Sequence, residues 1–288
     1  MAQTTTKKKR RKKRRRRRTG NTGVLLAALV LAVILLTLLF RWAYRWGQSA
    51  APEDEETAVT ETLPSSPLSS QGFGWSEGFK TYEDEQRVAK VGIDVSSHQG
   101  EIDWQAVRQS GVEFAVIRAG FRGYGDGSTR QDECFSYNIE SARENGLEVG
   151  IYFFSQALNE EEARAEAHEV LSMLEGYEIQ LPIYYDWEPI TEDEARTDTI
   201  SASELTACAK AFCQVIEAAG YRAGIYFNLN IAVDYYHILE LGDYAFWLAE
   251  YQETPSFPFA FSMWQYTSQG TVAGVDTNVD LDLYFIEK

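Results

Sequence analysis

The strongest constraint on the fold of this chain is a series of eight short apolar segments in its C-terminal two hundred residues. Each segment is rich in Val, Ile, Tyr, Phe and Trp, which is typical of buried strands. The first five connections between these segments have helical patterns, and the last two are short and turn-like. The predicted strands are Val91–Ser96, Phe114–Gly120, Val149–Ser155, Leu181–Glu188, Arg222–Asn228, Tyr244–Tyr251, Phe261–Thr267 and Asn278–Ile286.

The connecting segments predict about five helices. A capping box, Ser201 with Glu204, marks the start of the fourth helix, and Gly220 follows its end. Strands that alternate with helices favour a parallel α/β sheet, and eight of them in about 200 residues favour a small closed (β/α) barrel. The predicted helices are Asp103–Gln109, Gln131–Asn145, Glu160–Glu175, Ser203–Ala219 and Leu229–Leu239.

The N-terminal part of the chain predicts one transmembrane helix. Val24–Phe40 contains no charged residue and would span roughly 25 Å as a helix, close to the thickness of a bilayer core. Twelve consecutive basic residues, Lys7–Arg18, precede it, so the positive-inside rule places the N-terminus in the cytoplasm. We therefore expect a cytoplasmic basic tail at 1–22 and a signal anchor at 23–46. A cleaved signal peptide, with a cleavage site near Ala51, is the alternative.

The region after the anchor divides into a linker and a folded domain. Residues 47–88 are acidic and contain Ser, Thr and Pro, which predicts a flexible tether in which Gly72–Trp75 are the first residues expected to contact the domain at 89–288. All 43 acidic residues lie after position 52, which argues against nucleic acid as a partner of this domain. The basic tail is expected to bind anionic membrane lipid, with cytoplasmic nucleic-acid binding as its alternative function.

Carboxylates at predicted strand ends are the candidate catalytic groups. Asp94 ends the first strand, and Asp186 and Glu188 end the fourth, where a spacing of two places both on one face. In parallel α/β barrels the active site lies at these C-terminal ends. Paired carboxylates in different environments are what glycosidic cleavage requires, one as a proton donor and one ionised. The alternative is a salt-bridged strand end, with Arg118 or Arg222 as partner.

Several sequence blocks resemble the family 25 glycoside hydrolases, the muramidases of the Chalaropsis type. The resemblance covers about 90–288, and the order and spacing of the blocks make chance agreement improbable. One departure is Phe153, because many relatives carry His in a Tyr-His-Phe block there. The matching blocks are Gly92–Ser96, Gln99-Gly100, Ile102–Trp104, Phe114–Gly120, Gly150–Ser155, Pro182 with Asp186-Trp187-Glu188, Trp264–Ser268 with Gly270, and Asn278–Asp282.

The resemblance implies a flattened β/α barrel with eight strands and about five helices. It also implies hydrolysis of the β-1,4 bond between N-acetylmuramic acid and N-acetylglucosamine in peptidoglycan. Residue by residue, Glu188 matches the catalytic acid, Asp186 its carboxylate partner, and Asp94 and Asp280 the other two acidic site residues. Asp280 lies at the start of its strand, so the strand-end rule alone does not select it.

Sugar rings stack on aromatic side chains, so aromatic residues near strand ends are candidate substrate-binding residues, although barrel cores also use them. We expect no metal or cofactor, because the chemistry needs only carboxylates and no Cys or His spacing suggests a metal site. The candidate substrate-binding residues are Tyr152, Tyr184, Trp264, Tyr226, Arg118 and Gln265.

The sequence thus predicts a membrane-anchored, outward-facing muramidase that acts on peptidoglycan glycan strands. A non-catalytic wall-binding module on the same fold is the main alternative, although a binding module has no need to keep all four acidic residues. A polysaccharide deacetylase would need a metal site that typically contains two His. The chain has three His, and His168 lies in a charged helical stretch, which makes this alternative poor.

Overall fold

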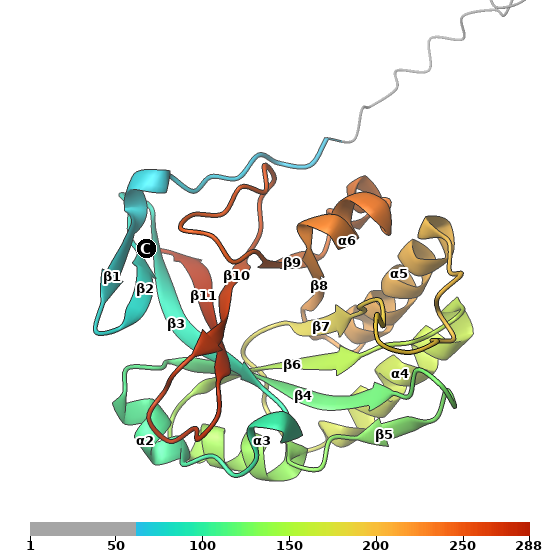
Figure 1. Ribbon diagram of the computed structural model, residues 1–288, viewed down its shortest axis with the longest axis horizontal. Coiled ribbons are helices and arrows are strands. Elements are labelled where there is room, and N and C mark those ends of the chain that lie inside the picture. Colours follow the sequence, from blue (N-terminus) through green and yellow to red (C-terminus); the bar gives the residue numbers. More distant parts are fainter. Residues whose placement is uncertain (1–61) are drawn as a thin grey trace, which may run out of the picture. The chain divides into compact units, whose positions relative to one another are not determined.

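The computed structural model describes residues 62–288 (Figure 1). The predicted basic tail, the predicted anchor at 23–46 and the first part of the predicted linker lie outside the described residues. Among the helices that the structure does describe, none has both the length and the apolar character needed to cross a membrane.

The described chain contains eight barrel strands, three further short strands and five α-helices. The eight predicted strands and five predicted helices are all present, with ends shifted by a few residues. The strands are β1 (Phe73–Ser76), β2 (Phe79–Tyr82), β3 (Arg87–Val95), β4 (Phe114–Arg122), β5 (Thr129–Gln131), β6 (Glu148–Phe154), β7 (Ile183–Asp186), β8 (Ala223–Asn228), β9 (Ala245–Ala249), β10 (Met263–Gly270) and β11 (Val279–Glu287). The helices are α2 (Trp104–Gln109), α3 (Phe135–Glu144), α4 (Glu160–Met173), α5 (Ala202–Ala218) and α6 (Leu229–Asp234).

The main sheet closes on itself as the predicted barrel. Its strand order is β3-β11-β10-β9-β8-β7-β6-β4, and β3 also pairs with β4, which completes the ring. Strand β5 adds to the edge of β4 as the second arm of a hairpin. Closure removes the exposed edges that an open sheet of this size would carry.

One strand runs against the direction that the alternating pattern predicts. Strand β11 is antiparallel to both of its neighbours, β10 and β3, whereas the other barrel strands pair in parallel. A parallel connection needs a crossover of about a dozen residues or more, and the segment between Gly270 and Val279 is shorter than that. The start of β11 therefore lies at the same end of the barrel as the ends of the parallel strands.

Large and small residues alternate in the barrel interior. Phe114 and Tyr184 fill it from β4 and β7, and glycines face them on neighbouring strands. A Cβ atom at Gly92 would lie 2.2 Å from the Phe114 ring, and one at Gly224 would lie 2.4 Å from the Tyr184 ring. Glycine is therefore needed at both positions for the barrel to close around these rings.

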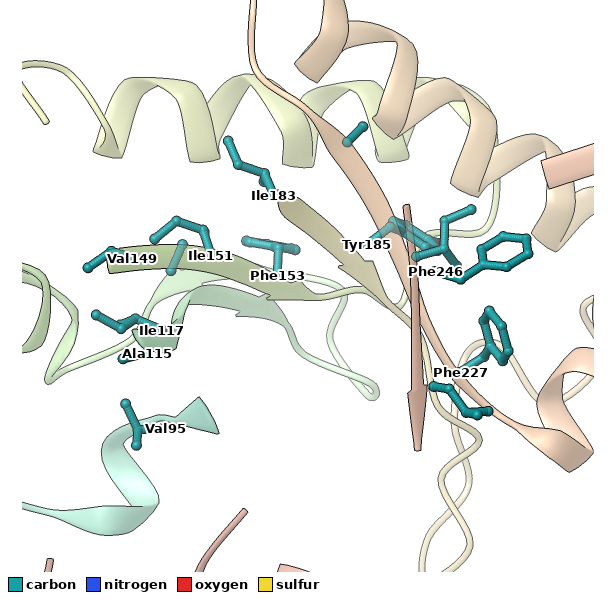
Figure 2. Close-up of a cluster of buried hydrophobic side chains, with 14 of the residues drawn as sticks. Val95, Ala115, Ile117, Val149, Ile151, Phe153, Ile183, Tyr185, Phe227 and Phe246 are labelled. Atoms are coloured by element: carbon teal, nitrogen blue, oxygen red, sulfur yellow. The ribbon is translucent and has the colours of Figure 1, made fainter. Parts of the chain in front are cut away.

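The outer face of the barrel packs against the helices. Alternate residues of the strands point outward, and Figure 2 shows Ile151, Phe153 and Ile183 among a larger cluster of such buried side chains. Helix α5 begins where the sequence predicts, because Ser201 and Glu204 form the capping box. It ends before Gly220, whose φ of 90° suits the left-handed turn that follows.

The predicted linker boundary at residue 88 is wrong for its C-terminal part. Residues 62–86 pack on the barrel. Strands β1 and β2 form a hairpin beside β3 and β11 (Figure 1). Ser65 forms an antiparallel bridge with Phe259, and Leu63 is buried. Phe79 and Tyr82 are buried, so a few apolar residues fix this stretch to the barrel although its average composition is polar. Residues 62–288 thus form one compact unit.

Candidate active site

Four carboxylates meet at one end of the barrel. Asp94 is the penultimate residue of β3 and Asp186 is the last residue of β7, while Glu188 lies two residues beyond β7. Asp280 is the second residue of β11, and the antiparallel register places it opposite Asp94. The side chains point inward because strand residues alternate, and Ile93, Val95 and Tyr185 point outward instead.

These carboxylates line a cleft with a volume of about 950 Å³. Eight of the ten predicted site residues contribute to its wall: the four acids together with Tyr152, Tyr226, Arg118 and Gln265. The cleft continues over the β4–β5 loop, where Tyr124 lines it, and passes Phe121 and Ile190. A cleft lined by both acidic side chains and aromatic rings is suited to a polysaccharide strand.

Two predicted substrate-binding residues do not reach the cleft. Tyr184 is fully buried inside the barrel, one inward-facing position below Asp186. Trp264 points outward from β10, where its indole is buried and donates a hydrogen bond to the carbonyl of Glu250 at 2.8 Å. Trp264 lies in one of the blocks that resemble family 25, but the face on which its side chain lies follows from strand alternation around the closed barrel.

Three residues outside the predicted set of site residues also belong to the site. Trp247 faces inward from β9, packs against Tyr226 with ring centroids 4.8 Å apart, and lines the cleft. Tyr251 follows β9 and is half exposed at the cleft wall. Asp282 lies one inward position below Asp280 and is fully buried. Alternation along β9 and β11 carries the signal for Trp247 and Asp282, since each is two residues from another inward-facing residue.

Gln265 organises the acidic end of the cleft. Its amide nitrogen donates to Asp94 Oδ2 at 2.7 Å. Its amide oxygen accepts hydrogen bonds from the hydroxyls of Tyr226 at 3.1 Å and Tyr251 at 2.8 Å. The two phenols fix the orientation of the amide, and the amide in turn fixes one oxygen of Asp94.

Deeper in the barrel, Trp247 forms a hydrogen bond with the buried carboxyl of Asp282. The indole nitrogen of Trp247 donates to Asp282 Oδ1 at 2.8 Å. The carboxyl of Asp282 also shares a side-chain hydrogen bond with the carboxyl of Asp94 above it. Asp282 therefore adds a further acidic group beneath Asp94 and Asp280, with a neutral donor as one of its partners.

The salt-bridge explanation for the strand-end acids does not hold in the described part of the chain. Arg118 pairs with buried Asp132 at 2.7 Å, and Arg222 donates to the Tyr284 hydroxyl and the Gln180 carbonyl. Among residues 62–288, no basic side chain lies within 4.0 Å of a carboxylate oxygen of Asp94, Asp186, Glu188 or Asp280. These four acids thus share a cleft without a direct cationic partner.

Burial and mutual repulsion raise the pKa values of these acids. Burial raises the pKa of Asp94 well above its usual value, and the charges of Asp280 and Asp282 add to the rise. Burial also raises the pKa of Asp280, to about 6. The pKa of Asp186 is raised well above normal by burial and by the charge of Glu188, against the opposing effect of Arg118. The cluster therefore retains protons at a pH where isolated carboxyls are ionised.

Glu188 is the carboxyl best placed to donate a proton. It lines the cleft and is only partly buried, whereas Asp186 is almost fully enclosed. Burial raises the pKa of Glu188, and the negative charge of Asp280 raises it further. A carboxyl with a raised pKa beside further carboxyls is an arrangement that glycosidic cleavage can use. Within residues 62–288, no group of three His, Cys, Asp or Glu side chains is arranged to hold a metal ion.

The chain is similar in sequence and in fold to known glycoside hydrolases. The model of the glycosyl hydrolases family 25 matches residues 93–275. The autolytic lysozyme of Clostridium acetobutylicum is 26% identical over 192 residues, which cover 66% of this chain and 54% of that protein. The lysozyme structure from Streptomyces coelicolor matches 68% of this chain and 91% of its own, with a TM-score of 0.55 and 26% identity.

The modular autolysin LytC of Streptococcus pneumoniae, solved in complex with a synthetic peptidoglycan ligand, has the same fold. Its TM-score is 0.61 at 23% identity, over 74% of this chain and 52% of LytC. This chain therefore spans about half the length of the autolytic lysozyme and of LytC. The hairpin β1–β2 and the first part of β3 precede the segment that the family model covers.

Proposed function

Because the chain belongs to family 25 of the glycosyl hydrolases, a family of peptidoglycan-hydrolysing enzymes, we propose that it is an N-acetylmuramidase. It cleaves the β-1,4 bond between N-acetylmuramic acid and N-acetylglucosamine. The observation that carries the proposal is the cluster of Asp94, Asp186, Glu188 and Asp280 in one cleft without a direct cationic partner. The relatives named lysozyme or autolysin support peptidoglycan as the substrate.

In this proposal Glu188 protonates the leaving glycosidic oxygen. Burial and the charge of Asp280 raise its pKa, which favours the protonated form that a general acid needs. Asp186, one inward-facing position before Glu188 along the same segment, supplies negative charge to the positive centre that develops at the sugar carbon as the bond breaks. Asp94, held by Gln265, and Asp280 position the sugar and maintain the negative potential of the cleft. Tyr152, Tyr226 and Trp247 contribute the aromatic surface of the wall.

The test of the activity is mass analysis of the fragments that the full chain releases from purified peptidoglycan in mild detergent. A muramidase leaves N-acetylmuramic acid at the new reducing ends, and we expect those fragments. Reducing-end N-acetylglucosamine would identify a different bond as the one that is cut. Binding to peptidoglycan without any release of fragments would instead indicate a non-catalytic wall-binding module.

We also propose that residues 23–46 anchor the domain to the outer face of the cytoplasmic membrane. The support is the uncharged segment Val24–Phe40 and the basic residues before it, which also suit contact with anionic lipid. In fractionated cells, the full-length chain is expected in the membrane, with the C-terminal domain accessible to external protease. A soluble form in the medium that begins at Pro52 or later would show cleavage instead of anchoring.

A further inference from the structure

Glu188 lies beyond the regular hydrogen bonding of its strand. Strand β7 ends at Asp186, whose carbonyl accepts from the backbone N–H of Ser155 at 2.7 Å. Residues 187–201 that follow form neither helix nor strand before α5 begins. The position of the Glu188 carboxyl therefore depends on contacts other than the sheet ladder.

A buried glutamine makes such a contact. Gln156 follows β6, is completely buried, and donates from its amide nitrogen to the backbone carbonyl of Glu188 at 3.0 Å. Its amide oxygen accepts from the hydroxyl of Thr197 at 2.6 Å. A carbonyl can only accept a hydrogen bond, so this amide has one orientation that satisfies both partners. Gln156 does not line the cleft, and the nitrogen and the oxygen of its amide each make one of these two bonds.

The segment that contains Thr197, the second partner of Gln156, is itself held in place by further hydrogen bonds. Thr197 is buried, and Arg196 beside it forms two hydrogen bonds to the carboxylate of Glu162 on α4, at 2.9 and 2.8 Å. Arg196 also donates to the backbone carbonyl of Gln156 at 3.3 Å. The segment that carries Glu188 is thereby connected at both ends to Gln156, which follows β6, and to α4 through Arg196.

We propose that Gln156 is a positioning residue that sets where the Glu188 carboxyl lies in the cleft. Its amide lies between the Glu188 carbonyl and the Thr197 hydroxyl and connects the two by hydrogen bonds. It touches neither the substrate nor the reacting atoms. The inference rests on the proposed function of Glu188 as the proton donor. A carboxyl displaced by about 1 Å from the glycosidic oxygen can lose on the order of a hundredfold in rate, so a remote hydrogen bond of this kind can matter to turnover.

The first test replaces Gln156 by methionine, which keeps the length of the side chain and removes both hydrogen bonds. We expect kcat on a defined peptidoglycan oligomer to fall by about 10- to 100-fold, with KM within about twofold of the unsubstituted enzyme. Thr197→Val should give a smaller fall in the same direction. Gln214→Met, at an exposed position on α5, is the matched control and should leave both constants unchanged.

A second measurement does not depend on turnover. Carboxyl NMR titration, with Glu188→Gln used for assignment, should show the pKa of Glu188 nearer to its ordinary value in Gln156→Met, because the carboxyl gains contact with solvent. In Gln156→Glu, the protonated side chain can still donate to the Glu188 carbonyl. The ratio of its kcat to that of the unsubstituted enzyme should therefore rise as pH falls.

The outcomes separate this inference from the proposed function. Folded Gln156→Met with an unchanged kcat and an unchanged Glu188 pKa overturns the positioning role while the muramidase proposal stands. If Gln156→Met does not fold, Thr197→Val and Gln156→Glu decide by the same criteria. An unsubstituted enzyme without turnover overturns the proposed function and this inference with it.

Discussion

Replacing Glu188 by glutamine should lower turnover by about 10²- to 10⁴-fold, the range typical of losing a positioned general acid. The amide has nearly the shape of the carboxyl but cannot donate the proton that the leaving oxygen requires. Glu188 is partly buried and lines the cleft, and its pKa is raised by burial and by Asp280. The fall should appear in kcat, because the lost interaction exists only in the transition state.

Binding and folding should survive this substitution. Glu188→Gln removes an ionisable group that no basic side chain in the described residues balances directly, so the variant should bind peptidoglycan fragments and unfold at a similar or higher temperature. Steady-state cleavage of a defined oligomer, with binding measured separately, is the test. Glu217→Gln, at an exposed position on α5, is the matched control. Near-normal kcat in folded Glu188→Gln would exclude Glu188 as the acid.

Asp186→Asn should lower activity and raise stability at neutral pH. Asp186 is buried, and its Oδ1 atom has no hydrogen-bond partner among residues 62–288. We expect kcat to fall by about a hundredfold or more, because a fixed negative charge beside the developing positive charge is lost. The melting temperature at pH 7 should rise by roughly 2–8 °C, because the ionised form is costly in this enclosed position.

The pH dependence of that stability difference has a definite sign. Burial and Glu188 raise the pKa of Asp186 in the folded state, so the unfolded chain releases its proton at a lower pH than the folded chain does. The stability associated with this group is fully present below the unfolded pKa of about 4 and is lost as pH rises through the folded pKa.

Thermal unfolding followed from about pH 3.5 to 8 checks this expectation. The melting temperatures of the unsubstituted protein and Asp186→Asn should converge at the acidic end and separate towards neutral pH. Asp243→Asn, at an exposed position just before β9 at the opposite end of the barrel, should show no such separation. A variant that is less stable than the unsubstituted protein at pH 7 would contradict the repulsive environment assigned to Asp186.

Local patterns predicted most of the fold. The eight barrel strands are visible in sequence because apolar and β-branched residues cluster within each one, and the start of α5 is visible because Ser201 and Glu204 cap it. The β1–β2 hairpin does not follow from the sequence pattern, because Phe79 and Tyr82 are isolated in a polar stretch and their burial depends on contacts with distant strands. Asp94, Asp186 and Glu188 followed from the strand-end rule, which needs only the direction of each strand.

By itself, the sequence determined which residues form strands and helices and which acids end the parallel strands, since propensity, periodicity and capping act over a few neighbouring residues. Only the tertiary structure decided that β11 runs antiparallel and places Asp280 opposite Asp94. It also decided that Trp247 faces the cleft whereas Trp264 faces outward, and that Gln156 reaches the carbonyl of Glu188. Strand direction, the inner face of a closed barrel and contacts between distant loops are set by pairing between residues far apart in the chain, where no local pattern carries the information.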